Sequence, residues 1–277
     1  MVTKSRGRLD GKVVVVIGAG SLGGSVAGEA GWGNGKAAAI CYAREGAKVV
    51  CVDFFEDRAA ETAAVIAAEG GSAIAHRADA TVEDDVDAAM AAAVGAFGHL
   101  DVVHNNVGVG RAYGFVHEVK PADWQREMDQ NLTSAYLGTR CAIPYLSSSG
   151  GGAIINTSSV LAVRFLRRQN TAYTVAKAAV EALTRATAVA YGPDNIRINC
   201  IRIGFSETPL VMSALEGLSD SERERQFAKS RAKVPLRHEH GDAFDVANAA
   251  VFLASDEAKH ITGVVLNVDG GLEFAPM

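Results

Sequence analysis

A chain of 277 residues, 48% of them apolar and only 6% aromatic, fits one large α/β domain with a core of Ala, Val, Ile and Leu better than a β-sandwich. Its net charge of −5, with no dominant run of Lys or Arg, argues against nucleic acid or an anionic membrane as a partner. Residues 1–10 carry no secretory signal and no apolar run approaches the roughly 20 residues that span a bilayer, so the sequence predicts a cytoplasmic protein.

Short apolar runs alternate with longer Ala-rich stretches along most of the chain. The predicted strands are 13–17, 49–52, 72–75, 100–104, 153–157, 196–203 and 264–268. The predicted helices include 56–69, 82–97, 123–146 and 171–191. Because Val/Ile-rich strands that alternate with helices form parallel sheets covered on both faces, the pattern predicts an α/β fold with a doubly wound parallel sheet in three layers. No linker divides the chain, so we expect a single domain over 1–277.

A glycine-rich segment, residues 18–23 (GAGSLG), follows the first predicted strand and matches GxGxxG. A helix that began at Gly23 would contain four interior glycines at about 1 kcal/mol each. We therefore expect a loop that runs through 31–35 and a helix at 36–45 closed by Gly46. The backbone at the glycines of both segments can then approach a pyrophosphate at the helix N-terminus. Residues 22–32 are extra relative to a minimal turn, and form either a flap beside the cofactor or a surface decoration.

The carboxylate of Asp53 ends the second predicted strand. Dinucleotide-binding folds contact the ribose 2′-hydroxyl at this place. A carboxylate accepts hydrogen bonds from the ribose of NAD and repels the 2′-phosphate of NADP, and such repulsion costs several kcal/mol. Asp53 therefore predicts NAD as the cofactor, with NADP as the alternative.

Tyr173 and Lys177 lie four residues apart in the predicted helix 171–191, so the phenol and the ammonium share one face. A nearby ammonium, together with a positively charged nicotinamide, favours the phenolate and lowers the pKa of Tyr173 from its ordinary value of about 10 toward neutrality. Upstream, Ser158 and Ser159 end a buried strand, where a hydroxyl can position a substrate oxygen for Tyr173. The combination predicts proton transfer at an alcohol or carbonyl oxygen.

Taken in order, these features resemble the short-chain dehydrogenase/reductase family, over nearly the whole chain from Leu9 to Gly271. The matching elements are the glycine-rich turn, Asp53, Asp79-Ala80, Asn105-Asn106-Val107-Gly108, Gln130-Asn131-Leu132, Ser159, Tyr173, Lys177, Asn195-Ile196-Arg197-Ile198-Asn199, Gly204, Thr208-Pro209 and Val268-Asp269-Gly270-Gly271. The resemblance implies a Rossmann-type oxidoreductase that transfers a hydride between NAD and a secondary alcohol or ketone. It also implies a homotetramer or a dimer, with the helices at 123–146 and 171–191 in one interface.

The resemblance further implies a role for each site residue. Tyr173 is the general acid/base, Lys177 holds the nicotinamide ribose and lowers the pKa of Tyr173, Ser159 orients the substrate oxygen, and Asn131 supports a water that links Lys177 to solvent. Ser159 is expected rather than Ser158, which stays open because Ser159 stands fourteen residues before Tyr173 where about thirteen is usual. The implied cofactor-binding residues are Gly18, Gly20, Ser21, Gly33, Asn34, Gly35, Asp53, Asp79, Ala80, Asn106, Gly108, Tyr173, Lys177, Ile203 and Thr208.

Within that set, Asp79 is expected to contact the adenine, Asn106 and Gly108 the adenosine side, and Thr208 with the Ile203 backbone the carboxamide. The chain departs from the family at three positions: Ile17 replaces a threonine, Val107 an alanine and Ile203 a proline. None of these changes removes a catalytic group. Residues 32–35 (WGNG) resemble a subset of the family with a lengthened cofactor loop.

Several features have more than one interpretation. Arg164, Arg167 and Arg168 either bind an anionic substrate or form a solvated basic loop. His104 is predicted to be a core histidine. His238 and His240 lack a third ligand, and the four cysteines form no CxxC pair, so no metal site is expected.

The charged segment 205–231 has no strand and is predicted to be a substrate lid or, alternatively, a pair of surface helices. Apolar residues in it (Phe205, Leu210, Val211 and Met212) favour a cyclic or aromatic alcohol as the substrate. Two other functions remain open beside the NAD-dependent dehydrogenase: an NADPH-dependent carbonyl reductase, which Asp53 opposes, and a dinucleotide-binding regulator without turnover, which Tyr173 and Lys177 oppose.

Overall fold

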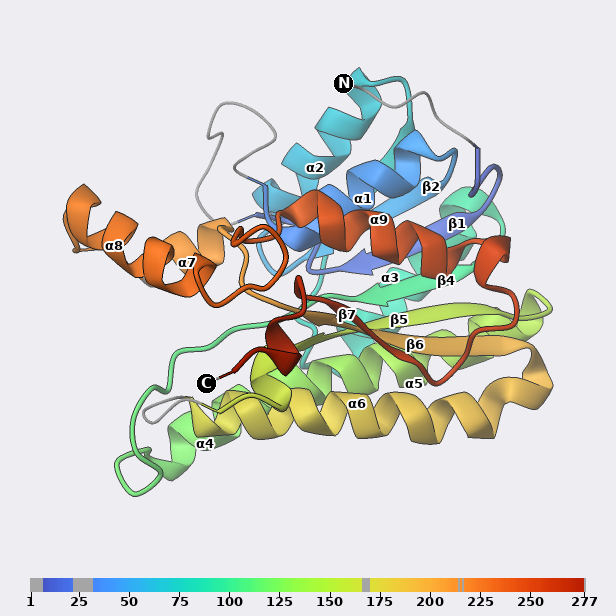
Figure 1. Ribbon diagram of the computed structural model, residues 1–277. Helices are drawn as coiled ribbons and strands as arrows, with labels where there is room; N and C mark the ends of the chain where they lie inside the picture. The colour runs from blue at the N-terminus through green and yellow to red at the C-terminus, as the bar shows by residue number, and fades with distance from the viewer. Residues whose placement is uncertain (1–6, 22–31, 166–169, 214, 216, 277) are drawn as a thin grey trace.

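The computed structural model of the protein describes residues 7–21, 32–165, 170–213, 215 and 217–276 (Figure 1). Its centre is a seven-stranded parallel sheet in the order β3-β2-β1-β4-β5-β6-β7. The strands are β1 (Val13–Ile17), β2 (Lys48–Asp53), β3 (Ser72–Arg77), β4 (Val102–Asn105), β5 (Gly152–Ser159), β6 (Ile196–Ile203) and β7 (Val265–Val268). Each predicted strand is present, with bounds within two residues of those expected.

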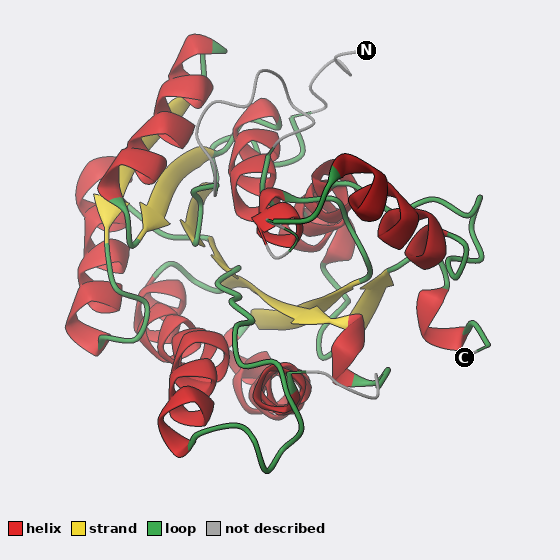
Figure 2. Cartoon of the chain, turned by 90° about the vertical axis from the view of Figure 1, so that its left-hand side faces the viewer, coloured by secondary structure: helices red, strands yellow, loops and turns green. Residues whose placement is uncertain are grey.

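Helices cover both faces of the sheet, so that the fold has three layers (Figures 1 and 2). On one face lie α1 (Asn34–Arg44), α2 (Glu56–Ala68) and α9 (Ala243–Ala254). On the other lie α3 (Glu83–Phe97), α5 (Ser134–Ser148) and α6 (Thr171–Tyr191). Successive residues of β1 enter the two cores in turn, which is why the strand reads as a continuous apolar run. The predicted doubly wound α/β fold is confirmed.

Helix α1 begins two residues before the predicted start and ends at Arg44, one residue before the predicted end. Gly33 is the N-cap residue, so Asn34 and Gly35 form the first turn. Gly46, one residue past the C-cap, has a φ of +95°, a conformation that glycine adopts without strain. The insertion at 22–32 lies outside the described residues except for Trp32.

The helix predicted at 123–146 is present, but a π-helical turn interrupts it. The structure has α4 (Pro121–Met128), a π-helical turn at Asp129–Thr133 and then α5. A π-turn adds one residue to the helical repeat and is common at functional sites. Here it contains the buried Asn131.

The predicted lid segment 205–231 carries two helices, α7 (Pro209–Ser213) and α8 (Asp220–Arg231). Ser219 and Glu222 form a capping box at the start of α8. The two helices extend from one end of the sheet, on the left of Figure 1. Within the described ranges, none of the helices combines the length and the apolar character that crossing a membrane requires.

His104 is buried in β4, as predicted for a core histidine. Its Nδ1 is 3.1 Å from the Tyr42 hydroxyl and its Nε2 is 3.2 Å from the Thr157 hydroxyl. Burial lowers the pKa of His104 to about 4. An unfolded histidine titrates at about 6.5, so the unfolded chain binds more protons between these two values.

We therefore expect the contribution of His104 to stability to be full above pH 6.5 and to fall as the pH drops toward 4. The loss between pH 7 and pH 5 should be about 2 kcal/mol. Urea unfolding of the wild type and of His104→Gln at both pH values measures it, because the variant should lack this part of the pH dependence. The half-exposed His99, replaced in the same way, is the control. An equal slope in all three proteins would contradict the prediction.

Candidate active site

The start of α6 holds Tyr173 beside the end of β5. Asn170 caps the helix, and its Oδ1 accepts a hydrogen bond from the Tyr173 backbone N–H at 3.0 Å. Ala172, Ala176 and Val180 bury one face of the helix. Because both the cap and the apolar face are fixed, Tyr173 has a defined position in the first turn.

The two serines at the end of β5 have different partners. Ser159 lies beside Tyr173, where its side chain lowers the pKa of the tyrosine, and its Oγ accepts from the Leu161 backbone N–H at 3.2 Å. The Ser158 hydroxyl is turned to the inner part of α6, at 3.0 Å from the Lys177 carbonyl and 2.9 Å from Glu181 Oε1. The structure thus brings Ser159, and not Ser158, to Tyr173.

Lys177 lies one turn after Tyr173 and is buried. Its Nζ donates to the carbonyl oxygens of Val107, at 3.1 Å, and Thr157, at 3.0 Å. The ammonium therefore ties the loop after β4 to the end of β5. Burial lowers the pKa of Lys177 to about 8.

The expected lowering of the Tyr173 pKa by Lys177 is not found in this structure. Burial raises the pKa of Tyr173 to about 12; the hydrogen bond from Ser159 lowers it, and the charges of Tyr113 and Glu127 raise it. Lys177 Nζ lies 5.8 Å from the centroid of the tyrosine ring and is engaged by the two carbonyls. The loss of hydration of the phenolate is thus the largest influence on the pKa of Tyr173.

Asn131 lies in the π-helical turn and fixes the loop after β4. Its Nδ2 donates to the Val109 carbonyl at 2.7 Å and to the Glu127 carbonyl at 2.8 Å, while its Oδ1 accepts from the Val109 N–H at 3.0 Å. Gly108 sits between the two polar side chains, since a Cβ there would lie 3.3 Å from Lys177 Nζ and 3.8 Å from Asn131 Oδ1. Asn131 and Lys177 therefore hold the residues on either side of Gly108, Val109 and Val107.

Glu127 was not found from the sequence. It is buried at the end of α4, and its Oε1 accepts from the backbone N–H groups of Arg111, at 2.5 Å, and Ala112, at 3.0 Å. The carboxylate thereby shapes the loop that faces Tyr173. The only hint in the sequence is Asn131, which lies four residues later in the chain.

The glycine-rich turn packs closely against the start of α1 and the turn after β4. Gly18 has a φ of +86°, and its carbonyl accepts from Asn106 Nδ2 at 3.1 Å. A Cβ at Gly35 would lie 1.9 Å from that same carbonyl oxygen. The turn after β1 and the turn after β4 therefore meet at the point where the order of the strands reverses, which is where α/β sheets bind ligands.

The N-terminus of α1 completes this cradle. Gly33 provides no side-chain cap, and the first turn of α1 has no acidic residue. The N–H groups and the positive end of the helix dipole suit a phosphate. The Gly33 N–H donates to Ser21 Oγ at 3.0 Å, so the residues that flank the insertion 22–32 are in contact with each other. These features fit a dinucleotide pyrophosphate.

Asp53 borders the glycine-rich turn from the end of β2. Its Oδ2 accepts from the Gly20 N–H and its Oδ1 from the Phe55 N–H, each at 3.0 Å. The carboxylate is partly exposed. It therefore has a fixed direction and remains accessible to a ribose.

The other predicted cofactor residues lie around the same edge of the sheet. Asp79 follows β3, and its Oδ1 accepts from the N–H and the hydroxyl of Thr81. Ala80 is buried beside it. Ile203 ends β6, and Thr208 is buried directly before α7. The carboxyl ends of the parallel strands thus bring the predicted residues to one side of the sheet.

Arg164 differs from the expectation of a solvated basic loop. Its guanidinium donates to the backbone carbonyls of Leu272, Ala275 and Pro276. Arg167 and Arg168 lie outside the described residues. His240 also has protein partners, Glu207 at 3.1 Å and Ser230 at 2.8 Å. Within the described ranges, no group of three or more His, Cys, Asp or Glu residues is arranged to hold a metal ion.

Comparison with known proteins places the chain in a family. The family model described as enoyl-(acyl carrier protein) reductase matches residues 28–273. The chain is 38% identical over 264 residues to 2,5-dichloro-2,5-cyclohexadiene-1,4-diol dehydrogenase of Sphingobium indicum, covering 95% of this chain and 97% of that one. It is 36% identical over 260 residues to cis-4-hydroxycyclohexanecarboxylate dehydrogenase of Sinomonas cyclohexanicum, covering 94% and 96%.

A solved structure supports the same assignment. The crystal structure of a protein from Burkholderia xenovorans, described as a short-chain dehydrogenase/reductase, matches with a TM-score of 0.86 at 36% identity. The match covers 98% of this chain and 99% of that one. The chain therefore belongs to the short-chain dehydrogenase/reductase family, whose members are oxidoreductases that use a nicotinamide dinucleotide and act on CH–OH and C=O groups.

Proposed function

We propose that the protein is an NAD-dependent dehydrogenase of secondary alcohols in which Tyr173 is the general acid/base. The observation that carries the proposal is that Ser159, Tyr173 and Lys177 lie together at the edge of the sheet that also holds the glycine cradle and Asp53. A nucleophile or metal is not needed for this chemistry, because a proton and a hydride are the only groups transferred.

Each residue has one task in the proposed mechanism. Ser159 and Tyr173 hold the substrate hydroxyl between them, and Tyr173 removes its proton as the carbonyl forms. An oxidised nicotinamide held by the cradle and Lys177 would supply the hydride acceptor and a positive charge. A positive charge near the phenol favours the phenolate and opposes the burial that raises the pKa of Tyr173.

Lys177 is proposed to hold the ribose next to the nicotinamide. A lysine ammonium has three N–H donors, of which the carbonyls of Val107 and Thr157 take two. The third can reach a ribose hydroxyl. Asn131 keeps the loop at Val109 in place, and from this position it supports the proposed water path from Lys177 to solvent.

Asp53 is proposed to select NAD over NADP, and its substitution tests this. We expect Asp53→Ser to lower the preference for NAD, expressed as the ratio of kcat/KM values, by about 100-fold, because the repulsion of the 2′-phosphate disappears. Steady-state rates with both cofactors give the ratio. Asp57→Ser, an exposed carboxylate on α2, is the matched control and should leave the ratio unchanged. A wild type that turns over with NADP alone would refute the assignment.

The proposed substrate class is a cyclic secondary alcohol. The two curated relatives named above act on ring alcohols by their names, and Val211 and Met212 of α7 present partly exposed apolar side chains, at 37% and 38%. A panel of cyclohexanols and acyclic secondary alcohols, followed by the absorbance of reduced NAD, tests the class. Faster turnover of the rings supports it; turnover of acyclic alcohols alone would exclude it.

We also propose that the segment 205–231 is a lid over this substrate, that the protein works as a homotetramer or dimer, and that it resides in the cytoplasm. Val175 and Val189, two exposed apolar residues on α6, a helix expected at the interface, support the assembly. The four cysteines are buried free thiols, which suits a reducing compartment.

A further inference from the structure

A 3-10 turn near the end of the chain, Leu272–Phe274, packs beside the proposed catalytic serine; we call it the C-terminal turn. Leu272 is fully buried and shares a small apolar cluster with Val160 and Val234. Val160 directly follows Ser159 in the chain. The C-terminal turn therefore contacts the neighbour of the residue that we expect to bind the substrate oxygen.

A row of polar residues crosses three strands close to this turn. Ser158 of β5, Arg202 of β6 and Asn267 of β7 are register partners on adjacent strands. They stand one residue before the row of Ser159, Ile203 and Val268. The polar row thus lies directly behind the strand ends that carry the proposed site.

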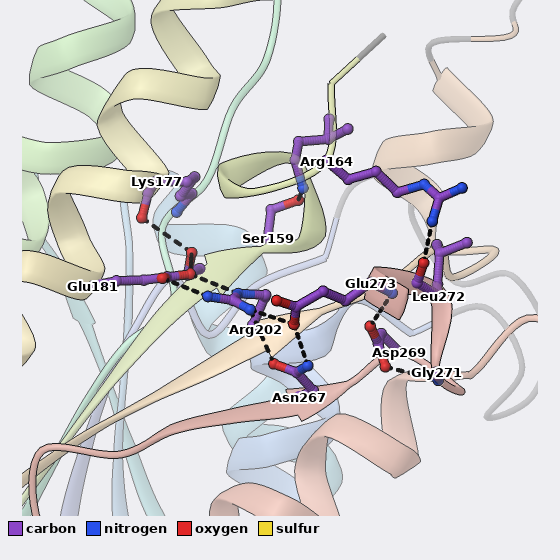
Figure 3. Close-up of polar contacts among 12 residues, drawn as sticks. Ser159, Arg164, Lys177, Glu181, Arg202, Asn267, Asp269, Gly271, Leu272 and Glu273 are labelled. Carbon is purple, nitrogen blue, oxygen red and sulfur yellow. Dashed lines mark hydrogen bonds and ion pairs between the residues drawn. The ribbon is translucent and has the colours of Figure 1, made fainter. Parts of the chain in front are cut away.

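Arg202 is at the centre of the row and is buried. Its guanidinium donates to both carboxylate oxygens of Glu181, at 2.8 and 2.6 Å, and to a carboxylate oxygen of Glu273 at 2.5 Å. Asn267 Oδ1 accepts a further hydrogen bond at 3.3 Å. Figure 3 shows the guanidinium between the two carboxylates. Arg202 therefore joins α6 to the C-terminal turn.

The other end of the network contacts residues of β5 and α6 that lie next to the proposed catalytic side chains. Glu181 lies one helical turn after Lys177, and its Oε1 is 2.9 Å from the Ser158 hydroxyl. The same hydroxyl is 3.0 Å from the Lys177 carbonyl oxygen. Ser158 directly precedes Ser159, and Lys177 lies one helical turn after Tyr173. A displacement of Glu181 or Arg202 would therefore move residues next to both members of the proposed Ser159–Tyr173 pair.

A second guanidinium holds the C-terminal turn from the opposite direction (Figure 3). Arg164 donates to the Leu272 carbonyl and, at 2.9 and 3.1 Å, to those of Ala275 and Pro276. Arg164 follows Ser159 by five residues, after the short 3-10 turn Val160–Ala162. The segment after the serine and the C-terminal turn are thus bound to each other by apolar contact and by hydrogen bonds.

The burial of these charges indicates that they serve to fix the positions of their partners. Removal of a guanidinium and its carboxylates from water carries a large cost, and pairing them offsets that cost without a large net gain in stability. Apolar side chains of similar volume would fill such space with equal stability. Charged and bidentate hydrogen bonds instead fix the direction of their partners.

We propose that Glu273 and Arg164 are positioning residues for the reaction: they clamp the C-terminal turn against Val160 and so hold Ser159 where the substrate oxygen must bind. The proposal rests on the proposed function, because it takes Ser159 as the residue that orients the substrate. It assigns the C-terminal turn to the wall of the substrate site.

The test compares Glu273→Ala and Arg164→Met with the wild type. We expect each to raise the KM for the alcohol about tenfold and to leave the dissociation constant of NAD within twofold, since the cofactor cradle lies on other strands. Glu273→Gln should recover most of the KM, because its amide oxygen can still accept from Arg202. The double variant should be little worse than either single one, because both residues hold the same turn.

Two further measurements separate positioning from general loss of structure. Phe274→Ala is the matched control: the side chain is 80% exposed in the same turn, and its removal should change neither KM nor unfolding temperature. Hydrogen exchange of the peptide 159–165 should be faster in Glu273→Ala and unchanged in Phe274→Ala. This readout needs no turnover, so it tests the clamp even if the wild type oxidises none of the alcohols tried.

Three results would overturn the proposal. One is a KM in Glu273→Ala equal to that of the wild type. Another is a lower kcat with an unchanged KM and a lower unfolding temperature, which is the signature of a smaller folded fraction. The third is equal exchange of 159–165 in both variants. A different outcome separates the two proposals. If the wild type oxidises none of the alcohols, but exchange of 159–165 is faster in Glu273→Ala and unchanged in Phe274→Ala, the proposed function is refuted and the clamp is supported.

Discussion

Replacement of Tyr173 by phenylalanine is expected to lower kcat about 10²- to 10⁴-fold, the range that a positioned general acid/base contributes. The ring fills the same space and Asn170 still caps α6 through the backbone, so the fold and the binding of NAD should be unchanged. Turnover of the best alcohol in the panel, together with a calorimetric titration of NAD, measures both quantities.

Tyr136→Phe provides the control for this prediction. Tyr136 is a half-exposed phenol on α5, and its loss should leave kcat unaltered. Residual activity of Tyr173→Phe within threefold of the wild type would show that another group moves the proton. Loss of NAD binding along with turnover would instead indicate that the phenol has a structural task.

Gly35→Ala should abolish cofactor binding. A Cβ at this position would lie 1.9 Å from the Gly18 carbonyl oxygen and 2.5 Å from Asn106 Nδ2. The first contact is with backbone of the turn itself, so relief requires that the turn or α1 move. We expect the dissociation constant of NAD to rise at least 100-fold, or about 3 kcal/mol.

The chain offers a matched glycine for comparison. Gly95 is exposed in the interior of α3, and a Cβ there would meet nothing within 4 Å. Gly95→Ala should therefore raise the free energy of unfolding by about 0.5–1 kcal/mol, the helix preference for alanine, and leave NAD binding as it is. If Gly35→Ala binds NAD as tightly as Gly95→Ala, the cradle assigned to this turn is wrong.

The sequence predicted the sheet well because its signal is local. Strands buried on both faces are continuous Val/Ile runs, and β1 reads as VVVVI in both the sequence and the core. The residues expected at the site also follow strand ends, and parallel strands deliver them to one edge. Asp53, Ser159 and Ile203 each end a strand at that edge, so the local strand pattern was enough to predict their positions.

The π-helical turn was missed because nothing in its own residues breaks a helix. The segment Asp129–Thr133 contains neither Gly nor Pro. Its distortion coincides with contacts of Asn131 to the backbone of Val109, on a loop far away in sequence. A tertiary contact of this type overrides local helix propensity and does not change the hydrophobic periodicity of the sequence.

The roles of two charged residues, Arg164 and Glu127, were not predicted for a related reason. Arg164 in a basic loop and Glu127 in a polar helix both have the sequence context of solvated side chains. Their partners are backbone groups: the carbonyls of the C-terminal residues for Arg164 and the N–H groups of Arg111 and Ala112 for Glu127. Every residue has a backbone carbonyl and every residue except proline has a backbone N–H, so the sequence does not reveal which of them will be used. The burial that raises the pKa of Tyr173 also depends on the whole fold and leaves no local signal in the sequence.

The contact between Ser21 and Gly33 has a consequence for how this fold can change. The Gly33 N–H is 3.0 Å from Ser21 Oγ, so the eleven residues between them add length to the chain without separating its two ends. An insertion that leaves and returns at the same point keeps every later strand in register, and closing a longer loop costs little more than closing a short one. A peptide tag, a reporter or a second binding segment can therefore be inserted at this position, next to the proposed cofactor cradle. The rest of the fold would remain unchanged.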